Sequence, residues 1–387
     1  MKQHICVISQ RYPCAATPAL HVFVQKLVHA MADLGAEVTV ISPIPVLSRK
    51  YKGTPAKYEE KTEKGISITI YRPRFMYFGQ KFTKPINTAK ISVQTMFDAC
   101  VKVIDENSIK ADAFYGHFIC AAGLVAARLG RKYDKPSFFA FGESSDWSYR
   151  HYGFEAVRKE LASVSGVVAV STLNRQRLID DSIVDGGKIK VFVNGVNTER
   201  FYPRDREESR KKFNVPKDAF TAAFVGQFVE RKGVLVANEA MRMTNTLGLF
   251  AGSGDEVPTG EHVLHAKRLT PEEIPYMLSA ADVFVFPSVN EGCSNALLEA
   301  MACAVPIVAT DAEFNYDILD ATNSIMVDGT KAGEIVAAIT KLKDDPELRR
   351  SMAAASLEKV KSLTIEKRAE NILAFISECG EKYASGK

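Results

Sequence analysis

The feature that most constrains the fold of this chain is the alternation of short, continuous apolar runs with amphipathic stretches. The run HICVIS (4–9) precedes the amphipathic stretch LHVFVQKLVHAMADLG (20–35), and a second apolar run, EVTVISP (37–43), follows it. Apolar strands separated by helical patterns are typical of a parallel sheet that helices cover on both faces. Further runs of this type continue to residue 195: ISITIYR, DAFYGHF, SFFAF, VVAVS and IKVFVNG.

The pattern stops at a charged, proline-containing segment, residues 197–218, which is interpreted as a linker and a short helix. It then begins again with the runs FTAAFVGQF, LGLFAGSG, HVLHAK, ADVFVFPS, VPIVAT and SIMVD. With 387 residues, the chain is long enough for two cores. We therefore expect an α/β fold of two doubly wound, Rossmann-like domains, residues 1–197 and 198–363, facing across a ligand-binding cleft. A terminal helix at about 364–387, with Thr364 as its N-cap, is expected to pack back on the first domain.

Composition excludes several classes of protein. No run approaches the roughly 20 apolar residues of a membrane span, and the N-terminus MKQHICVISQRYP has no long apolar core typical of a secretory signal. The seven cysteines are scattered and show no CxxC spacing, which favours reduced thiols. We expect a cytoplasmic protein, with the inner face of the membrane as a candidate site of action.

Charge is unevenly distributed along the chain. Residues 1–200 carry 28 Lys and Arg against 18 Asp and Glu, whereas the remainder carries 22 against 28. The segment 70–90 combines Arg72, Arg74, Lys81, Lys84 and Lys90 with aromatic residues. This mixture favours contact with a peripheral membrane surface or a lipid-linked acceptor; packing on the core is the alternative. Without a nucleic-acid-binding signature in the sequence, we expect no nucleic-acid partner.

The stretch PSVNEGCSNALLEAMACAVPIVAT (287–310) places Glu291 before a predicted helix and Glu299 inside it. The helix is expected to begin near Ser294 or Asn295. A helix start at the carboxyl edge of a parallel strand binds anions through its free N–H groups and its dipole. Glu299 shares a face with Asn295 and can accept hydrogen bonds from a ribose diol, and Glu291 can do the same for another polyol. The alternative, two merely solvated glutamates, is less favoured for the pair than for either one alone.

The segment EGCSNALLEAMACAVPIVAT resembles the E-x7-E signature of the retaining glycosyltransferases of family four, which have the GT-B fold. IKVFVNGVNTERFYP (189–203), FVGQFVERKG (224–233) and LTPEEIPYMLSAADVFVFPS are similar to further segments of that family, in the same order. The resemblance spans nearly the whole chain and is strongest from residue 165 to 310. It implies a nucleotide-sugar donor, UDP- or GDP-linked, on the second domain and a glycan or lipid-linked acceptor on the first.

The resemblance also implies roles for individual residues. Glu299 would bind the ribose hydroxyls, Glu291 the donor sugar, and Lys232 the diphosphate with help from Arg231. His117, in FYGHF, has a counterpart in the family and would be a catalytic residue. The remaining donor-binding positions are Gly226, Gln227, Arg268, Gly292, Cys293, Ser294, Asn295 and Ala296. Catalysis would stabilise the leaving group electrostatically without a metal ion or other cofactor, because the sequence has no D-x-D motif.

The chain departs from the family pattern at three places. Gln227 stands where the family usually has Arg, and Phe141 stands where a His often lies near the donor sugar, a role that Glu143 or His117 could take. The glycine-rich turn after the first strand is replaced by RYPCAATPALHVF, with Ala19 or Leu20 in place of glycine.

The interpretation that fits best is a retaining, metal-independent transfer of a hexose to a growing glycan in cell-surface polysaccharide synthesis. A sugar-nucleotide epimerase or hydrolase on the same scaffold is an alternative, as is a degenerate, non-catalytic nucleotide-binding protein. A nicotinamide dehydrogenase is disfavoured, since no G-x-G-x-x-G follows the first strand.

Overall fold

The structure is a computed structural model that describes residues 3–18, 20–79, 82–83 and 86–386, with the backbone alone for residues 82 and 83. The chain divides into two compact units. Unit 1 comprises Met1–Phe192 and Ile365–Lys387, and unit 2 comprises Val193–Thr364. Ala19, which the sequence suggested as a substitute for glycine, lies outside the described residues, as do Lys81 and Lys84.

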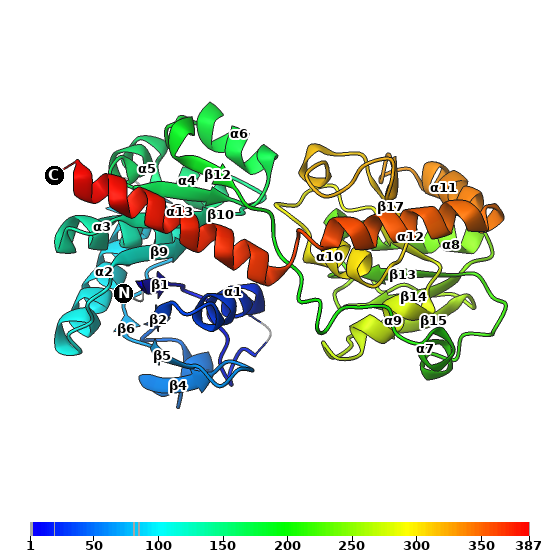
Figure 1. Ribbon diagram of the computed structural model, residues 1–387, viewed down its shortest axis with the longest axis horizontal. Coiled ribbons are helices and arrows are strands. Elements are labelled where there is room, and N and C mark those ends of the chain that lie inside the picture. Colours follow the sequence, from blue (N-terminus) through cyan, green and yellow to red (C-terminus); the bar gives the residue numbers. More distant parts are fainter. Residues whose placement is uncertain (1–2, 19, 80–81, 84–85, 387) are drawn as a thin grey trace. The chain divides into compact units, whose positions relative to one another are not determined.

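Unit 1 is built on an eight-stranded sheet (Figure 1) with the order β12-β11-β10-β9-β1-β2-β5-β4. All neighbours pair in parallel except β4, which is antiparallel to β5. The strands are β1 (His4–Ile8), β2 (Glu37–Ile41), β4 (Lys57–Lys61), β5 (Ser67–Tyr71), β9 (Ala113–His117), β10 (Ser137–Phe141), β11 (Gly166–Ala169) and β12 (Ile189–Val191). Two small ribbons accompany the sheet: β3 (Ile44–Pro45) with β6 (Arg74–Phe75), and β7 (Phe82–Thr83) with β8 (Ile86–Asn87).

The continuous apolar character of these strands follows from burial on both faces. In β10, Phe138 and Ala140 enter one core cluster, whereas Phe139 and Phe141 enter the other. Successive side chains point to opposite faces of a sheet, so a strand with two covered faces must be apolar at every position. Phe141 is fully buried beside Tyr149. Phe141 is therefore a core residue. It cannot contact a donor sugar as the histidine that the family usually has at this position does.

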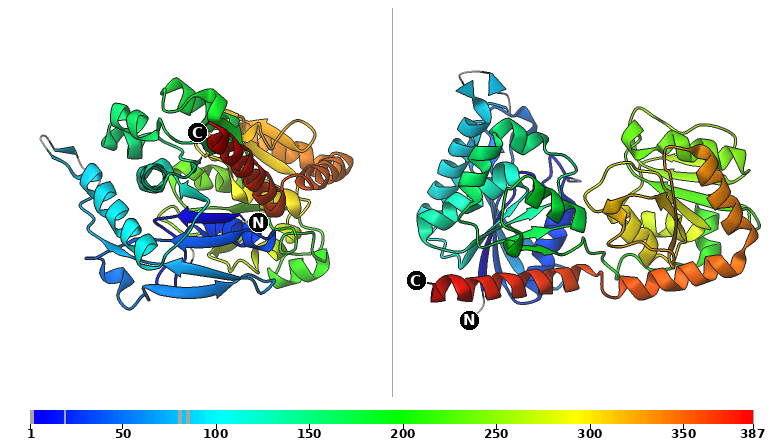
Figure 2. Two further views of the ribbon diagram at one scale, coloured as in Figure 1. Left: turned by 60° about the vertical axis from the view of Figure 1, so that its left-hand side comes forward. Right: turned by 90° about the horizontal axis from the view of Figure 1, so that it is seen from above.

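Helices cover both faces of the sheet of unit 1 (Figures 1 and 2). The helices α1 and α13 pack together over one core cluster, and α2, α3 and α5 over the other. The helical elements are η1 (Arg49–Tyr51), α1 (Val22–Asp33), α2 (Thr88–Glu106), the π-helical turn η2 (Ile119–Gly123), α3 (Leu124–Tyr133), α4 (Trp147–Tyr152), α5 (Phe154–Leu161), α6 (Thr172–Asp180), η3 (Gly186–Lys188) and α13 (Ile365–Ser385).

Unit 2 contains a six-stranded parallel sheet with the order β15-β14-β13-β16-β17-β18. Helices α8 and α11 bury one face with apolar side chains at helical spacing, and α9 and α10 lie against strands β13 and β17. The strands are β13 (Thr221–Val225), β14 (Leu247–Ala251), β15 (Val263–Lys267), β16 (Val283–Phe286), β17 (Ile307–Thr310) and β18 (Ser324–Val327). The helices are α7 (Arg206–Lys212), η4 (Glu230–Lys232), α8 (Val234–Met243), α9 (Ile274–Ala280), α10 (Asn295–Ala302), η5 (Glu313–Asn315), α11 (Ala332–Asp344) and α12 (Pro346–Val360).

The chain passes from unit 1 to unit 2 slightly before the expected position. Residues 193–197 belong to unit 2, because the backbone of Val196 pairs with Thr364 and the side chain of Asn194 donates to the Cys293 carbonyl oxygen. The terminal helix α13 belongs to unit 1. Among the described residues, no helix combines the length and the apolar character needed to cross a bilayer.

Candidate functional site

The sheet of unit 2 reverses its strand order between β13 and β16. From β13 the sheet continues through β14 to β15 on one side, whereas β16, β17 and β18 follow on the other. In open parallel sheets, ligands bind at the carboxyl ends of the strands where the order reverses, because the loops after the two central strands diverge there. The loops after β13 and β16 contain most of the site residues predicted from the sequence.

These two loops lie against each other. The Val289 N–H donates to the Arg231 carbonyl oxygen at 3.1 Å, which ties the loop after β16 to the turn η4. Gly233, between η4 and α8, has a φ of +65°, and a Cβ atom there would lie 2.7 Å from the Pro287 carbonyl oxygen. Only glycine permits both this conformation and this close approach. The glycine in the sequence ERKG therefore brings the residues before it next to Glu291.

Glu291 is the centre of a charged cluster. Its Oε1 accepts a hydrogen bond from Ser288 Oγ at 2.6 Å and from an Arg231 guanidinium nitrogen at 3.1 Å, and it pairs directly with Lys232 Nζ. The side chains of Glu291 and Lys232 are only 13% and 14% exposed. Two cations and one carboxylate leave one positive charge at the reversal point. This arrangement suits a diphosphate bound close to a hydroxyl-bearing group.

Helix α10 begins beside this cluster. Ser294 occupies its N-cap, although the serine hydroxyl makes no capping bond, and Gly292 and Cys293 form the turn before it. The Cys293 carbonyl oxygen accepts a bond from Asn194 Nδ2 at 3.1 Å, which fixes that turn. The amides at the start of α10, including those of Asn295 and Ala296, therefore lie at the carboxyl edge of the sheet, where helix starts attract anions.

Glu299 lies on α10, one turn after Asn295, and is partly buried. Burial is the main cause of the raised pKa of the Cys303 thiol, and the negative charge of Glu299 raises that pKa further. The side chains of Glu299 and Cys303 therefore lie close together. The residues Asn295 and Glu299 share a helix face, as the spacing indicated.

The loop after β13 is fixed by the loop after β14. The Phe228 N–H donates to the Ser253 carbonyl oxygen at 2.9 Å, and a Cβ atom at Gly252 would lie 1.8 Å from the Gly226 carbonyl oxygen. Arg268 Nε donates to Ser253 Oγ at 2.7 Å, which attaches the end of β15 to the same loop. Gln227 is exposed between these anchors. Gly226, Gln227 and Arg268 thus all lie at the carboxyl edge of this sheet.

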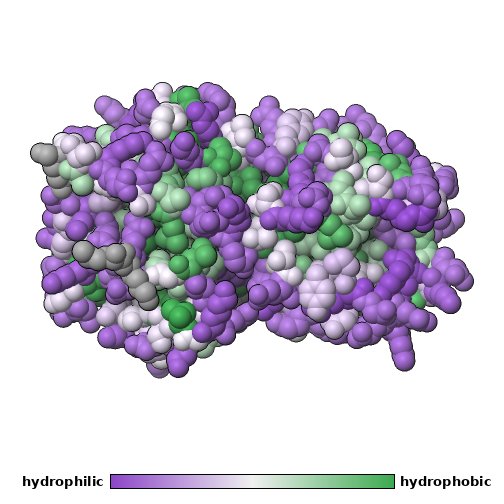
Figure 3. All heavy atoms as spheres, viewed as in Figure 1, coloured by the Kyte–Doolittle hydropathy of each residue, from purple (hydrophilic) through white to green (hydrophobic). Residues whose placement is uncertain are grey.

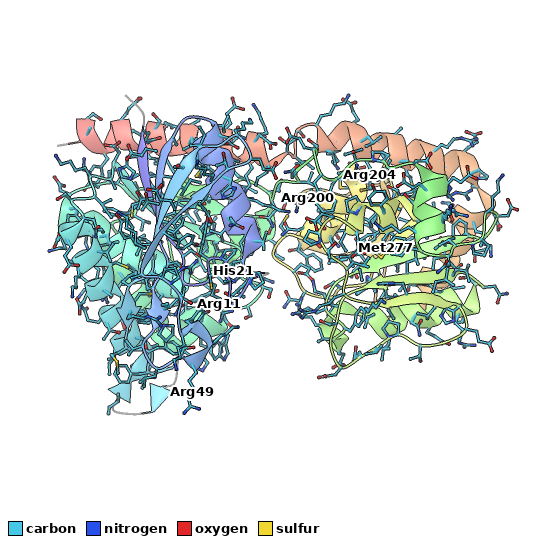
Figure 4. The ribbon with its side chains drawn as sticks, turned by 90° about the horizontal axis from the view of Figure 1, so that it is seen from below. Arg11, His21, Arg49, Arg200, Arg204 and Met277 are labelled. Atoms are coloured by element: carbon cyan, nitrogen blue, oxygen red, sulfur yellow. The ribbon has the colours of Figure 1, made fainter. Side chains whose placement is uncertain are left out.

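His117 belongs to unit 1, at the carboxyl end of β9. It is 6% exposed, its Nε2 has no hydrogen-bond partner within the described part of the chain, and its ring packs edge-on against Tyr115. Burial first, and then Arg368 and His21, lower its pKa to about 3. The imidazole is therefore neutral at physiological pH. Burial and the neighbouring Arg11 similarly lower the pKa of His21 to about 4. Figure 4 shows the side chains of Arg11 and His21 near each other.

Glu143 follows β10 and holds the segment after His117. Its carboxylate accepts hydrogen bonds from the Ile119 N–H at 2.8 Å and the Gly142 N–H at 3.2 Å, and Asn174 Nδ2 donates to its carbonyl oxygen at 2.9 Å. Burial raises the pKa of Glu143 to about 7, although the backbone donors act in the opposite direction. A carboxyl that titrates near neutrality is a candidate for proton transfer or for positioning its neighbours.

This raised pKa has a consequence for stability. Between about pH 4.5 and pH 7 the unfolded chain has released the Glu143 proton and the folded chain still holds it, so the free energy of unfolding should fall as the pH rises. Glu143→Gln removes this contribution while keeping one acceptor for Ile119. We expect the melting temperature of the variant, relative to the parent, to increase from pH 5 to pH 8 in parallel thermal melts. A difference that stays constant over this range would contradict the prediction.

The basic and aromatic segment 70–90 separates into two parts. Tyr71 and Phe75 are buried in the core, and Arg72 is only 1% exposed, with its guanidinium bonded to Pro13 O, Tyr58 OH and other groups. Arg72 is therefore unavailable to an external partner, which corrects its inclusion in the basic surface. Arg74 and Lys90 are exposed.

Two contributors to the site were not predicted. Ser288 donates to the Glu291 carboxylate, and Asn194 fixes the turn before α10. Both belong to quoted motifs, FPS and NGV, but a serine after a strand and an asparagine in a hinge carry no distinctive pattern. Neither unit, in its described ranges, contains a group of three His, Cys, Asp or Glu side chains suited to hold a metal ion.

Two models of known protein families match the chain, one mainly in unit 1 and the other in unit 2. Residues 20–200 match the model described as Glycosyltransferase Family 4, and residues 205–359 match the model described as Glycosyl transferases group 1. TuaC of Bacillus subtilis (strain 168), provisionally named a teichuronic acid biosynthesis glycosyltransferase, is 26% identical over 357 residues, which cover 87% of this chain and 88% of TuaC. A GDP-mannose-dependent alpha-(1-6)-phosphatidylinositol monomannoside mannosyltransferase of Mycolicibacterium smegmatis is 25% identical over 362 residues, covering 87% of each chain.

Solved structures agree on the fold. The sucrose-phosphate synthase of Thermosynechococcus elongatus superposes with a TM-score of 0.77 at 17% identity, covering 97% of this chain and 99% of that one. HepE of Anabaena, solved in complex with UDP, gives a TM-score of 0.72 at 14% identity, covering 97% of this chain and 100% of HepE. The two family models match consecutive parts of the chain. The two mainly parallel sheets, one in each unit, agree with the fold of these solved structures. The chain therefore belongs to family 4 of the glycosyltransferases and is a glycosyltransferase with the GT-B fold.

Proposed function

We propose that the protein transfers a hexose, with retention of configuration and without a metal ion, from a UDP- or GDP-linked sugar to a glycan or lipid-linked saccharide. The observation that carries this proposal is the cluster of Glu291 with Ser288, Arg231 and Lys232 at the point where the strand order of unit 2 reverses. A nucleoside diphosphate leaving group develops negative charge as the glycosidic bond breaks. Lys232, Arg231 and the start of α10 would stabilise that charge, which is the work a metal ion would otherwise do.

The hydroxyl-binding roles are divided between the two glutamates. Glu299, on the same face of α10 as Asn295, would accept hydrogen bonds from the ribose diol. Glu291, next to the cations, would accept bonds from hydroxyls of the donor sugar. The Asn295 and Ala296 amides would lie near the phosphates, with Gly292 leaving room for the sugar. Gln227 and Arg268 would contact the nucleotide from the loops after β13 and β15. His117 would act in unit 1 as a neutral hydrogen-bonding catalytic group.

Cell-surface polysaccharide synthesis at the cytoplasmic face of the membrane is the setting that we propose. TuaC is named for teichuronic acid biosynthesis and the Mycolicibacterium relative for a lipid-linked acceptor. One name gives the synthesis of teichuronic acid and the other a glycolipid acceptor, which supports a glycan or glycolipid acceptor here.

A nucleotide titration tests the proposal. We expect one of UDP, GDP and ADP to raise the melting temperature, and Glu299→Ala to weaken its binding about tenfold or more, because a charged hydrogen bond to a diol is removed. Calorimetry measures the affinity. Glu358→Ala, which affects only an exposed pair with Lys361 on α12, is the matched control and should bind as the parent does.

Each alternative predicts another outcome. If no nucleotide binds, the chain is a degenerate, non-catalytic member of its family. If donor sugar is epimerised or hydrolysed rapidly in the absence of any acceptor, the main activity is not transfer. An inverted anomeric configuration in the product, measured by NMR, would contradict retention.

A further inference from the structure

Two segments of unit 1 contain no acidic residue. Residues 44–57 include Arg49, Lys50, Lys52 and Lys57, and residues 71–97 include five more Lys and Arg. A chain with 46 Asp and Glu among its 387 residues would ordinarily place several of them in 41 positions. Their absence from both segments therefore produces an extended positive potential wherever the two segments lie together.

The structure joins these segments directly. Strand β3 pairs with β6, which sets Ile44 opposite Arg74 and Pro45 opposite Phe75. The Val46 N–H donates to the Phe75 carbonyl oxygen at 2.9 Å. A guanidinium nitrogen of Arg74 donates to the Tyr51 carbonyl oxygen at 2.9 Å, which ties β6 to the turn η1. The two acid-free segments therefore form one continuous surface.

The cations of this surface are accessible. All of its described basic residues other than the buried Arg72 are exposed: Arg49, Lys50, Lys52, Lys57, Arg74 and Lys90. Figure 4 shows the side chain of Arg49 at the outer end of unit 1, pointing away from the body of the unit. None of these six forms an ion pair with a described residue. Their charge is therefore not neutralised by a described carboxylate, although Lys57 lies over the Tyr71 ring and Lys90 over the Tyr152 ring.

Apolar side chains concentrate on the same surface. The described part of unit 1 exposes ten large hydrophobic side chains, and seven belong to the two segments: Val46, Leu47, Met76, Tyr77, Phe78, Ile86 and Ile91. Leu47 is 79% exposed, and Val46 and Phe78 are 46% and 47% exposed. Figure 3 shows a different face of unit 1, where apolar side chains lie among hydrophilic ones. We call these seven residues and the six exposed cations the docking surface.

We infer that the docking surface binds an anionic lipid bilayer, with Val46 and Leu47 entering the headgroup region and the surrounding cations contacting lipid phosphates. Basic and apolar side chains on two segments that contain no acidic residue match the charge and the layered polarity of an anionic leaflet. A nucleic acid would meet the positive charge, but it offers no extended apolar layer to the aliphatic Val46 and Leu47. This inference rests on the proposed function only in that a lipid-linked acceptor would bring the enzyme to a membrane.

Vesicle co-sedimentation of the full chain tests the inference. We expect binding to vesicles of phosphatidylcholine with 30% phosphatidylglycerol, weak binding to phosphatidylcholine alone, and release by high salt. The triple variant Arg49→Glu, Lys50→Glu and Lys52→Glu should bind about 100-fold more weakly or worse, since each basic residue contributes about a factor of five or more. Leu47→Ser should weaken binding by up to about tenfold. All four positions are exposed, so the variants should keep the melting temperature of the parent.

A matched control separates local charge from net charge. Lys211→Glu, Lys217→Glu and Lys341→Glu change the net charge equally on exposed positions of unit 2 and should leave vesicle binding unchanged.

Equal losses in both triple variants would overturn the inference, as would no binding to anionic vesicles. Binding of a random oligonucleotide in preference to vesicles, or a dimer abolished by Leu47→Ser, would assign the surface to nucleic acid or to a second copy. Nucleotide affinity of the same variants should match the parent, so failure here leaves the donor-site proposal separately testable.

Discussion

Replacing Lys232 by alanine is expected to lower the rate of glycosyl transfer about 100- to 1,000-fold, the usual effect of removing one preorganised charge that stabilises a transition state. Lys232 is well buried, is held against Glu291, and has its ammonium 5.6 Å from the centre of the Phe286 ring. In this low-dielectric position its charge acts strongly on a departing diphosphate. Initial rates of nucleoside diphosphate release measure the effect. Calorimetry should show weaker binding of the nucleoside diphosphate and unchanged binding of the nucleoside.

Lys232 could instead serve only to neutralise Glu291, and a double variant distinguishes the two roles. The comparison is made with Glu291→Gln alone: if neutralisation is the only role of Lys232, Lys232→Ala causes no further loss of activity in the Glu291→Gln background, whereas if Lys232 stabilises the leaving group, it causes a further large loss. Lys331→Ala is the control, because Lys331 forms only exposed ion pairs in the same unit. Arg231→Ala should have a smaller effect than Lys232→Ala, since Arg231 is 39% exposed and more strongly screened by solvent.

Gly252→Ala is expected to destabilise unit 2 by about 3 kcal/mol or more, because overpacking against a rigid backbone forces two loops apart. The new Cβ atom would lie 1.8 Å from the Gly226 carbonyl oxygen and 2.8 Å from the Phe228 ring. Neither neighbour can move without breaking the hydrogen bonds between the loops after β13 and β14. Differential scanning calorimetry should show a lower transition temperature for unit 2.

The effect of Gly252→Ala should extend to nucleotide binding, because the displaced loop carries Gln227. Gly333→Ala is the matched control. Gly333 lies in helix α11 with no atom within 4 Å of its new Cβ, and alanine favours helix, so this variant should be as stable as the parent or slightly more so. Unchanged melting of Gly252→Ala would mean that the two loops shift freely, contrary to the contacts described above.

The sequence predicted the long parallel strands and missed the short or charged ones. Strands such as SFFAF are apolar at each position because both of their faces are buried, and that pattern is visible in the sequence. Strand β4, KYEEK, has no apolar run because it is an edge strand with exposed side chains. The pair β3 and β6 has two residues in each strand, too few for any periodicity. It nevertheless joins the two halves of the docking surface.

The candidate site could be anticipated in its charged residues and less well in their supports. Glu291, Arg231 and Lys232 belong to recognisable motifs, and the structure brings them together. Ser288 and Asn194 contribute through hydrogen bonds that depend on how loops fold in space. Arg72 shows the converse: its sequence context resembles a surface, yet it is buried because the loop after β1 offers carbonyl oxygens to its guanidinium.

Because helix α13 follows unit 2 in the sequence but belongs to unit 1, unit 2 can fold before unit 1 is completed during synthesis. Unit 2 is one continuous stretch, Val193–Thr364, so all of its core is present before the last helix is synthesised. Unit 1 differs, since Ile372, Phe375 and Ile376 of α13 complete a core cluster that also contains Val7 and Phe138. During synthesis, the apolar face of unit 1 that α13 covers therefore stays exposed until α13 has left the ribosome. The nascent unit 1 is the part of this molecule most in need of protection by a chaperone.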